Sequence, residues 1–167
     1  NNHYIKQLSS DEVVELALPH LQKAGLLPAV LNDQERQWAK RLITLYQEQM
    51  RYGAELPELA ALFFREEIDY GPEAQAILGA EEVPRVLRSF LSHVEALEPF
   101  EEEPLKGSLK SVQKETGVKG KQLYMPIRVA CTGQAHGPDL VQSLVLLGKE
   151  KIISRLKKAL AEVAPSQ

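Results

Sequence analysis

The chain has 167 residues, 44% of them hydrophobic, with 20 Lys and Arg against 23 Asp and Glu and a formal net charge of −3. This composition is typical of a folded globular protein of one or two domains and excludes a disordered chain. The longest apolar stretch, near residues 140–147, contains Gln142 and Ser143 and is far shorter than the roughly 20 residues that cross a bilayer. We therefore expect no transmembrane helix and no membrane partner.

A single cysteine, Cys131, excludes an intrachain disulfide and a cysteine-rich zinc site. Because it follows Val129 and Ala130, we expect a small buried hydrophobic residue rather than a nucleophile. This cysteine usage indicates a reducing compartment, the cytoplasm. The first residues carry neither an initiator methionine nor a targeting pattern, as expected for a piece of a longer protein.

Helix-start and helix-end signals recur in the first hundred residues and predict five helices. A capping box begins the first helix at Ser9, and Pro19 is expected to bend or split that helix. Asn32 or Asp33 caps a second, strongly amphipathic helix that is expected to end at Gly53. Three more helices are predicted after prolines suited to a first helical turn: residues 57–67, 72–78 and 84–97.

The second half also indicates helices, over residues 105–115, 138–148 and 149–164, with a glycine-containing basic loop over residues 117–124. Residues 125–132 alternate like a short strand, but Pro126 and the helical surroundings favour a short buried helix. The predicted fold class is therefore all-α.

The charge changes sign along the chain. Residues 1–103 hold nine Lys and Arg against 19 Asp and Glu, whereas residues 104–167 hold eleven against four. The change coincides with a joint rich in Pro and Glu, residues 98–104, which predicts an acidic helical subdomain over 1–98 and a basic one over 99–167. A basic surface attracts anionic partners such as phosphate backbones.

The basic residues fall into two groups. Four C-terminal lysines fit equally well as the solvated face of a helix: Lys149, Lys151, Lys157 and Lys158. A second group has Glu115 as its only acidic neighbour from position 106 to 128, which favours a ligand: Lys106, Lys110, Lys114, Lys119, Lys121 and Arg128.

Enzyme signatures are missing from the sequence. It contains no Walker A loop, GxGxxG, His-Glu-x-x-His, GxSxG or Cys-x-x-Cys motif, and the acidic clusters lack the apolar surroundings that would raise a carboxyl pKa. The histidines at positions 3, 20, 93 and 136 show no metal-ligand spacing. We therefore expect no catalytic residue, no metal and no cofactor in this chain.

The stretch KGKQLYMPIRVACTGQAHGPDL, residues 119–140, carries the features of a site for single-stranded RNA. A basic loop with glycines can approach phosphates closely, Tyr124 can stack on a base, and the planar fork of Arg128 can read a base edge. Gln134 and His136 in the following loop add polar contacts. The alternative for Arg128 is a purely structural role at a helix end or beside a Glu.

This stretch, with the following LLGKEKIISRL, resembles the C-terminal anticodon-binding region of bacterial-type glutamyl-tRNA synthetase. The opening NNHYIKQLSSDEV is similar to the segment that follows that family's catalytic and stem-contact domains, so the resemblance covers the whole chain. It implies two consecutive helical subdomains that form an anticodon-binding cage. Neither catalytic signature of the class I synthetases occurs here.

The resemblance also implies roles for particular residues. By the Met-Pro-x-Arg motif, Arg128 contacts an anticodon base, and Gly137, Pro138 and Leu140 lie against the anticodon as backbone or apolar contacts. Arg51 occupies a place comparable to an arginine that, in some members, distinguishes tRNA-Glu from tRNA-Gln. Its alternative is a solvated arginine at a helix end.

Together these features predict a monomeric domain that binds the anticodon arm of tRNA-Glu within a cytoplasmic ligase, with tRNA-Gln left open as a second partner. That parent would join glutamate to tRNA-Glu with ATP and Mg, whereas this domain alone would not aminoacylate. The alternative is a helical interaction module whose basic face binds an acidic protein.

Overall fold

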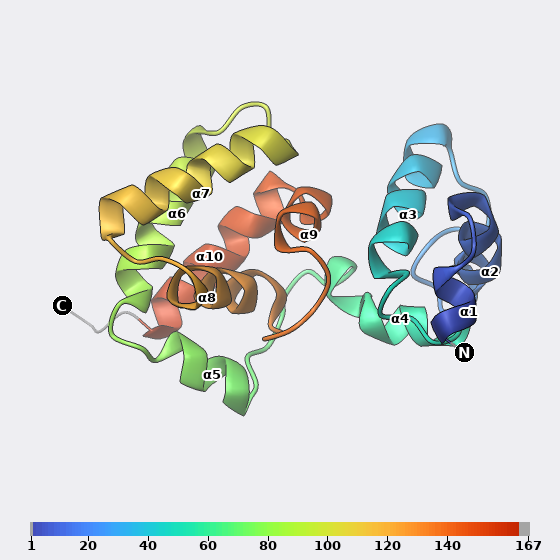
Figure 1. Ribbon diagram of the computed structural model, residues 1–167, viewed down its shortest axis with the longest axis horizontal. Coiled ribbons are helices and arrows are strands. Elements are labelled where there is room, and N and C mark those ends of the chain that lie inside the picture. The colour runs from blue at the N-terminus through green and yellow to red at the C-terminus, as the bar shows by residue number, and fades with distance from the viewer. Residues whose placement is uncertain (1, 164–167) are drawn as a thin grey trace. The chain divides into compact units, whose positions relative to one another are not determined.

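The computed structural model describes residues 2–163, and their side chains from residue 4 onward. The side chain of His3 and the expected helix end at Ala164 lie outside the described residues. Every regular element in this part of the chain is a helix, which confirms the all-α prediction (Figure 1). None of these helices is long and apolar enough to span a membrane.

The chain forms two compact units, Asn1–Arg65 and Glu66–Gln167. The first unit is built on α2, which contacts α3, α4 and η1. Its elements are α1 (Asn2–Lys6), α2 (Ser10–Lys23), α3 (Asp33–Tyr46), the 3-10 helix η1 (Gly53–Glu55), α4 (Leu56–Leu59) and the 3-10 helix η2 (Ala61–Phe63).

Local capping signals set the starts of the two long helices of this unit. Ser9 accepts the backbone N–H of Glu12 at 3.2 Å, and the Glu12 carboxylate accepts that of Ser9 at 2.8 Å. Asn32 and Glu35 repeat this capping box at the start of α3, with distances of 2.8 and 2.9 Å. Both starts match the sequence prediction because each box satisfies two N–H groups that have no partner within the helix.

The later course of the first unit differs from the prediction. Of the two outcomes expected at Pro19, a split does not occur: α2 is one continuous helix, with the buried Leu18 and Leu21 on both sides of the missing N–H. α3 ends at Tyr46, well before Gly53. The expected helix over residues 57–67 is instead two short pieces, α4 and η2.

The second unit surrounds α6, which contacts α7, α8 and α10. Its six helices are α5 (Pro72–Leu78), α6 (Val83–Ala96), α7 (Glu102–Thr116), α8 (Lys121–Thr132), α9 (Leu140–Leu147) and α10 (Lys149–Val163). Figure 1 shows α7 lying along α6. The predicted range of α5 agrees with the structure, whereas α8 begins four residues before the expected position 125.

The boundary between the compact units differs from the predicted division at residues 98 and 99. It lies between Arg65 and Glu66, because α5 and α6 pack against helices of the second half of the chain. The acidic stretch 66–103, with two Lys and Arg against eleven Asp and Glu, therefore shares one unit with the basic stretch that follows it. A change of charge sign along a chain need not mark a change of domain.

Gly53 is buried where η1 lies against α2, and it offers a test of this packing. A Cβ at Gly53 would lie 2.9 Å from Cδ2 of His20 and 3.1 Å from the backbone oxygen of Leu16. We expect Gly53→Ala to lower the free energy of unfolding by about 1–3 kcal/mol through overpacking. Urea unfolding of both proteins measures this change.

The matched control is Gly107→Ala in α7, where a Cβ would meet nothing within 4 Å. The same chemical change should there raise stability by roughly 0.5–1 kcal/mol, because alanine loses less conformational entropy in a helix. Equal stabilities of the two variants would contradict the close packing at Gly53.

Candidate nucleic-acid interface

Lys121, Tyr124 and Arg128 lie on one face of α8. Positions three, four and seven apart on an α-helix share a face, so Lys121 and Arg128 are separated by about 10 Å along the axis with Tyr124 between them. All three are at least partly exposed, and Tyr124 is 40% exposed. Because α8 begins at Lys121, Tyr124 is held on a helix and not in the expected loop.

The loop after α8 brings Gly137 against the Arg128 guanidinium. A Cβ at Gly137 would lie only 3.0 Å from Nη1 of Arg128. Arg128 as a whole residue is half-buried. The absence of a side chain at Gly137 leaves the space that this guanidinium uses.

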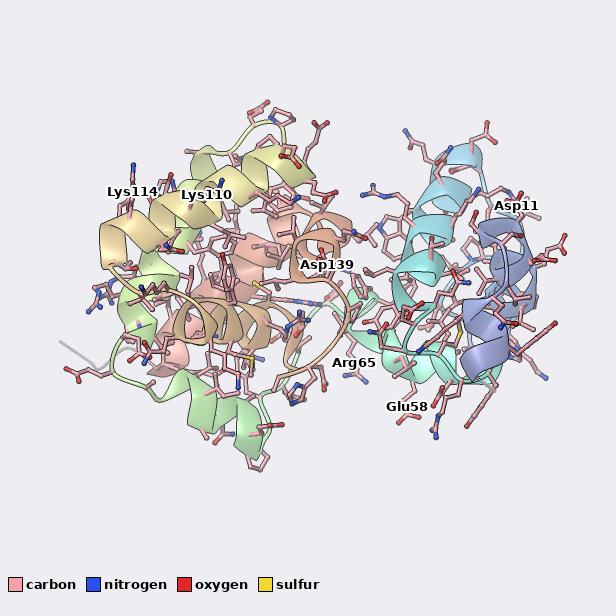
Figure 2. All side chains as sticks on the ribbon, viewed as in Figure 1. Asp11, Glu58, Arg65, Lys110, Lys114 and Asp139 are labelled. Atoms are coloured by element: carbon pink, nitrogen blue, oxygen red, sulfur yellow. The ribbon has the colours of Figure 1, made fainter. Side chains whose placement is uncertain are left out.

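The same loop is fixed at both ends. At its start, the Thr132 hydroxyl donates to the Arg128 carbonyl at 2.7 Å and accepts the Gln134 N–H at 3.1 Å. At its end, the Asp139 carboxylate accepts the Gln142 N–H at 2.9 Å and caps α9. Asp139 lies at the start of α9 in Figure 2.

The exposure of the loop residues separates the predicted contacts into two kinds. Gln134, His136 and Gly137 are exposed and can meet a ligand directly. Pro138 and Leu140 are buried and pack inside the unit. Neither residue therefore offers the exposed apolar surface that the resemblance implied.

Of the five lysines in the second basic group, from which we expect contacts to phosphates, four are exposed and form no ion pair within the described residues: Lys110, Lys114, Lys119 and Lys121. Figure 2 shows Lys110 and Lys114 projecting from one side of α7. Lys106 differs, because its ammonium pairs with Glu102 at 3.4 Å and Glu103 at 3.3 Å. Its charge is partly compensated within the protein.

Glu115, the one acidic residue among these lysines, is bound by α6. Its carboxylate lies 2.7 Å from Nε2 of His93 and accepts the Ser89 hydroxyl at 3.0 Å. The His93 hydrogen bond, with a smaller contribution from Ser89, lowers the pKa of Glu115 from its usual value. The carboxylate is thus engaged by α6 while the lysines remain exposed.

Arg51 belongs to the first unit and is held by Glu55. Its guanidinium donates to Oε2 of Glu55 through Nη2 at 2.8 Å and Nε at 3.1 Å, and its backbone N–H donates to Oε1 at 2.7 Å. These hydrogen bonds raise the pKa of Arg51 and lower that of Glu55. Arg51 is thus an exposed arginine that is paired with Glu55.

Comparison with known proteins identifies the family. The model of a family described as anticodon binding domain matches residues 12–160. The chain belongs to this anticodon-binding domain family. It is 58% identical over 97% of its length to the glutamate-tRNA ligase of Geobacillus stearothermophilus and 57% identical over 94% to that of Bacillus subtilis.

The chain spans about a third of the length of these relatives, 33% and 32% respectively. A solved structure described as a glutamate tRNA ligase from Elizabethkingia meningosepticum matches 98% of this chain and 31% of its own, with a TM-score of 0.82. At 21% sequence identity, this likeness concerns the fold.

Arg85 is a basic residue of this anticodon-binding domain that the sequence prediction missed. From α6, it donates through Nη2 to the carbonyl of Thr116 at 3.3 Å, beside the turn that carries Lys119. The sequence alone does not show that Arg85 lies near this turn, because Arg85 stands among acidic residues in the sequence. Its position follows only from the packing of α6 on α7.

Cys131 lies in the core of the second unit, as predicted. It is fully buried, and burial raises the pKa of its thiol to about 12, so it remains protonated and unreactive at neutral pH. Within the described residues, no three His, Cys, Asp or Glu side chains form a group that could hold a metal ion.

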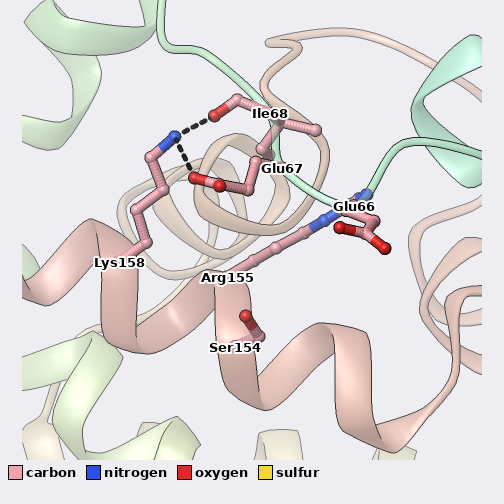
Figure 3. A pocket seen from close by; sticks show the side chains of 6 residues that line it. All are labelled: Glu66, Glu67, Ile68, Ser154, Arg155 and Lys158. Atoms are coloured by element: carbon pink, nitrogen blue, oxygen red, sulfur yellow. Dashed lines mark hydrogen bonds and ion pairs between the residues drawn. The ribbon is translucent and has the colours of Figure 1, made fainter.

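A pocket of about 350 Å³ lies beside α10, where Arg155 and Lys158 extend toward residues 66–68 (Figure 3). Lys158 donates to the carbonyl of Ile68 and lies 4.0 Å from the Glu67 carboxylate. These contacts hold the segment before α5 against α10. We therefore assign the residues that line this pocket a structural role.

The hydrogen bonds of the Glu115 carboxylate with His93 and Ser89 predict that the stability of the fold depends on pH. A carboxyl whose pKa is lower in the folded state stabilises the fold above its unfolded pKa, near 4.5, and this contribution disappears as the pH falls through the folded pKa. We expect Glu115→Gln to lower the thermal midpoint at pH 6, with a smaller difference from the parent at pH 3. Thermal unfolding at both pH values measures this, and a constant difference would contradict it.

Proposed function

We propose that this domain binds the anticodon arm of tRNA-Glu and reads its bases with Arg128. The observation that carries the proposal is the half-buried Arg128, whose guanidinium lies against Gly137 on the α8 face that also bears Lys121 and Tyr124. The membership of the anticodon-binding family supports it.

Base reading rests on α8 and the loop that follows it. The planar guanidinium of Arg128 donates in a fork that suits a base edge. Tyr124 offers a ring for stacking, and Gln134 and His136 are exposed for polar contacts with an unpaired base. Because Gly137 has no side chain, the guanidinium can lie close to the loop, next to the exposed Gln134 and His136.

Affinity comes mainly from the exposed lysines around the turn between α7 and α8. Lys114, Lys119 and Lys121 surround residues Gly117 and Gly120, both of which have positive φ. Phosphate contacts position an RNA without reading its sequence. Lys110 extends this surface along α7, and Lys106 contributes less because Glu102 and Glu103 already neutralise it.

The parent of this domain is a cytoplasmic glutamate-tRNA ligase that joins glutamate to tRNA-Glu with ATP and Mg. The identity of 58% to such a ligase supports this assignment. The domain is monomeric and orients the tRNA for chemistry that takes place elsewhere in the parent. Arg51 discriminates tRNA-Glu from tRNA-Gln. To contact a base, its guanidinium must first release the Glu55 carboxylate.

The rival function is a helical module that binds an acidic protein through the same lysines. Titration of the chain with a tRNA-Glu anticodon stem-loop separates the two. Salt-sensitive binding at micromolar or lower concentration supports RNA binding, whereas no binding at low salt supports the protein partner.

We expect Arg128→Ala to weaken binding of the cognate stem-loop much more than that of a stem-loop with a substituted anticodon. The loss of discrimination should be about 1–3 kcal/mol, the scale of a base-reading arginine. Fluorescence titration with both RNAs measures the ratio of the two dissociation constants.

The matched variant Arg128→Lys keeps the positive charge and removes the planar fork. It should retain most of the affinity for the substituted stem-loop while losing discrimination. An equal loss of affinity for both RNAs in Arg128→Ala would refute base reading by this residue.

We expect Lys121→Ala to weaken all stem-loops alike and to flatten the dependence of binding on salt. Loss of one phosphate contact should reduce the slope of log K against log salt by roughly 0.7. Lys106→Ala is the matched control and should change the slope less, because its ammonium is already paired with two carboxylates. Equal slopes for Lys121→Ala and the parent chain would remove Lys121 from the phosphate path.

A further inference from the structure

The C-terminal end of α8 is held by side chains from outside the helix. The last four carbonyl groups of an α-helix have no partner within it. In α8 the carbonyl of Val129 accepts the N–H of Gly133 at 2.8 Å, as in other helices that end in a left-handed glycine. The next two carbonyls accept side-chain donors that are distant in sequence.

Tyr70 and Arg155 supply these two donors. The Tyr70 hydroxyl donates to the Ala130 carbonyl at 2.7 Å, and Nη1 of Arg155 donates to the Cys131 carbonyl at 2.9 Å. Tyr70 is 7% exposed and Arg155 2% exposed, so water cannot easily replace either bond. Burial also raises the pKa of Tyr70, which keeps its hydroxyl protonated as a donor.

Backbone contact reinforces the same end of the helix. Gly133 ends α8 with φ of 77°, and a Cβ there would lie 3.1 Å from the Asp69 carbonyl. The segment that carries Asp69 and Tyr70 therefore lies directly against the point where α8 becomes the loop. The Tyr70 ring is itself held by Lys158, whose Nζ lies 5.6 Å from the ring centre.

We infer that the Tyr70 hydroxyl is a positioning group for Arg128, and that it tunes which anticodon base the domain accepts. Arg128 lies two residues before the carbonyl that Tyr70 holds, and Gly137 lies seven residues after it. The bond fixes the last turn of α8, and with it the distance between the guanidinium and the loop. This inference rests on the proposed base reading by Arg128.

The Tyr70 hydrogen bond would affect base selectivity through the position of the Arg128 guanidinium. A base edge is read by hydrogen bonds that tolerate only small displacements, whereas lysines on flexible stems follow a phosphate that moves. Loss of the Tyr70 bond leaves the buried Ala130 carbonyl without its donor, so the last turn of α8 must shift to find another. The shift should reduce selectivity while general RNA affinity is retained.

The test is Tyr70→Phe in the 167-residue chain, titrated with the cognate tRNA-Glu anticodon stem-loop and with one that carries a substituted anticodon base. We expect the ratio of the two dissociation constants to fall about fivefold, the scale of coupling within one hydrogen-bonded network. Affinity for the substituted stem-loop and the salt slope should stay within twofold of the parent.

A double variant shows whether Tyr70 acts through Arg128. In the Arg128→Ala background, Tyr70→Phe should cause no further change in the ratio. If Arg128→Ala alone leaves the ratio unchanged, the proposed base reading fails. If Arg128→Ala lowers the ratio while Tyr70→Phe does not, or if Tyr70→Phe lowers it equally in both backgrounds, this inference alone fails.

A second pair of variants keeps the test decisive if Tyr70→Phe does not fold. Thr132→Val and Thr116→Val remove equivalent hydroxyls, since each threonine donates to a carbonyl four residues earlier at 2.7 Å. Thr132→Val at the end of α8 should lower the ratio, whereas Thr116→Val at the end of α7 should leave it unchanged. Equal ratios in both variants would overturn the inference that the end of α8 sets selectivity.

Discussion

The arrangement around Arg128 depends on how the buried end of α8 satisfies its carbonyl groups. Each of these groups would cost free energy if it were removed from water without a donor. Tyr70 provides one donor from 60 residues earlier in the chain, and Arg155 provides another from 24 residues later. Because these bonds converge where α8 passes into the loop of Gly137, the same constraint closes the core and places the guanidinium. The fold and the site therefore share one set of hydrogen bonds.

Helices α7 and α8 end in the same local structure, but the segments that follow them differ. Each helix ends in Thr-Gly: the threonine hydroxyl accepts the N–H two residues later at 3.1 Å, and the glycine is left-handed. After α7, this ending leads into a short exposed turn that carries Lys119. After α8, Gly133 meets the backbone at Asp69 and the loop continues past Arg128. The same local chemistry therefore ends both helices, but a Cβ at Gly117 would meet nothing within 4 Å, whereas Gly133 is packed against the segment before α5.

Features that depend on neighbours in sequence could be predicted, and features that depend on packing could not. The capping boxes at Ser9 and Asn32 and the proline-led α5 follow from residues within one helical turn. The division between the units depends on the packing of α5 and α6 against later helices, so charge counts misplaced it. The glycine signal at Gly53 likewise misplaced the end of α3, which is at Tyr46. In the site, helical spacing places Lys121, Tyr124 and Arg128 on one face once the start of α8 is known. The ion pairs of Lys106 were readable from its spacing to Glu102 and Glu103, but the burial of Pro138 and Leu140 was not.

The second unit contains both groups of residues on which the proposed RNA recognition rests. Its acidic stretch, residues 66–103, and its basic helices belong to one compact body, so the charge asymmetry can orient an anionic partner as a whole. The lysines that would hold phosphates lie on exposed stems and gain little from exact placement. Base reading needs a fixed fork, and Arg128 emerges from a helix whose end is buried and bonded. In the proposed function, affinity therefore depends on exposed lysines, whereas selectivity also depends on buried groups such as Tyr70 and Arg155.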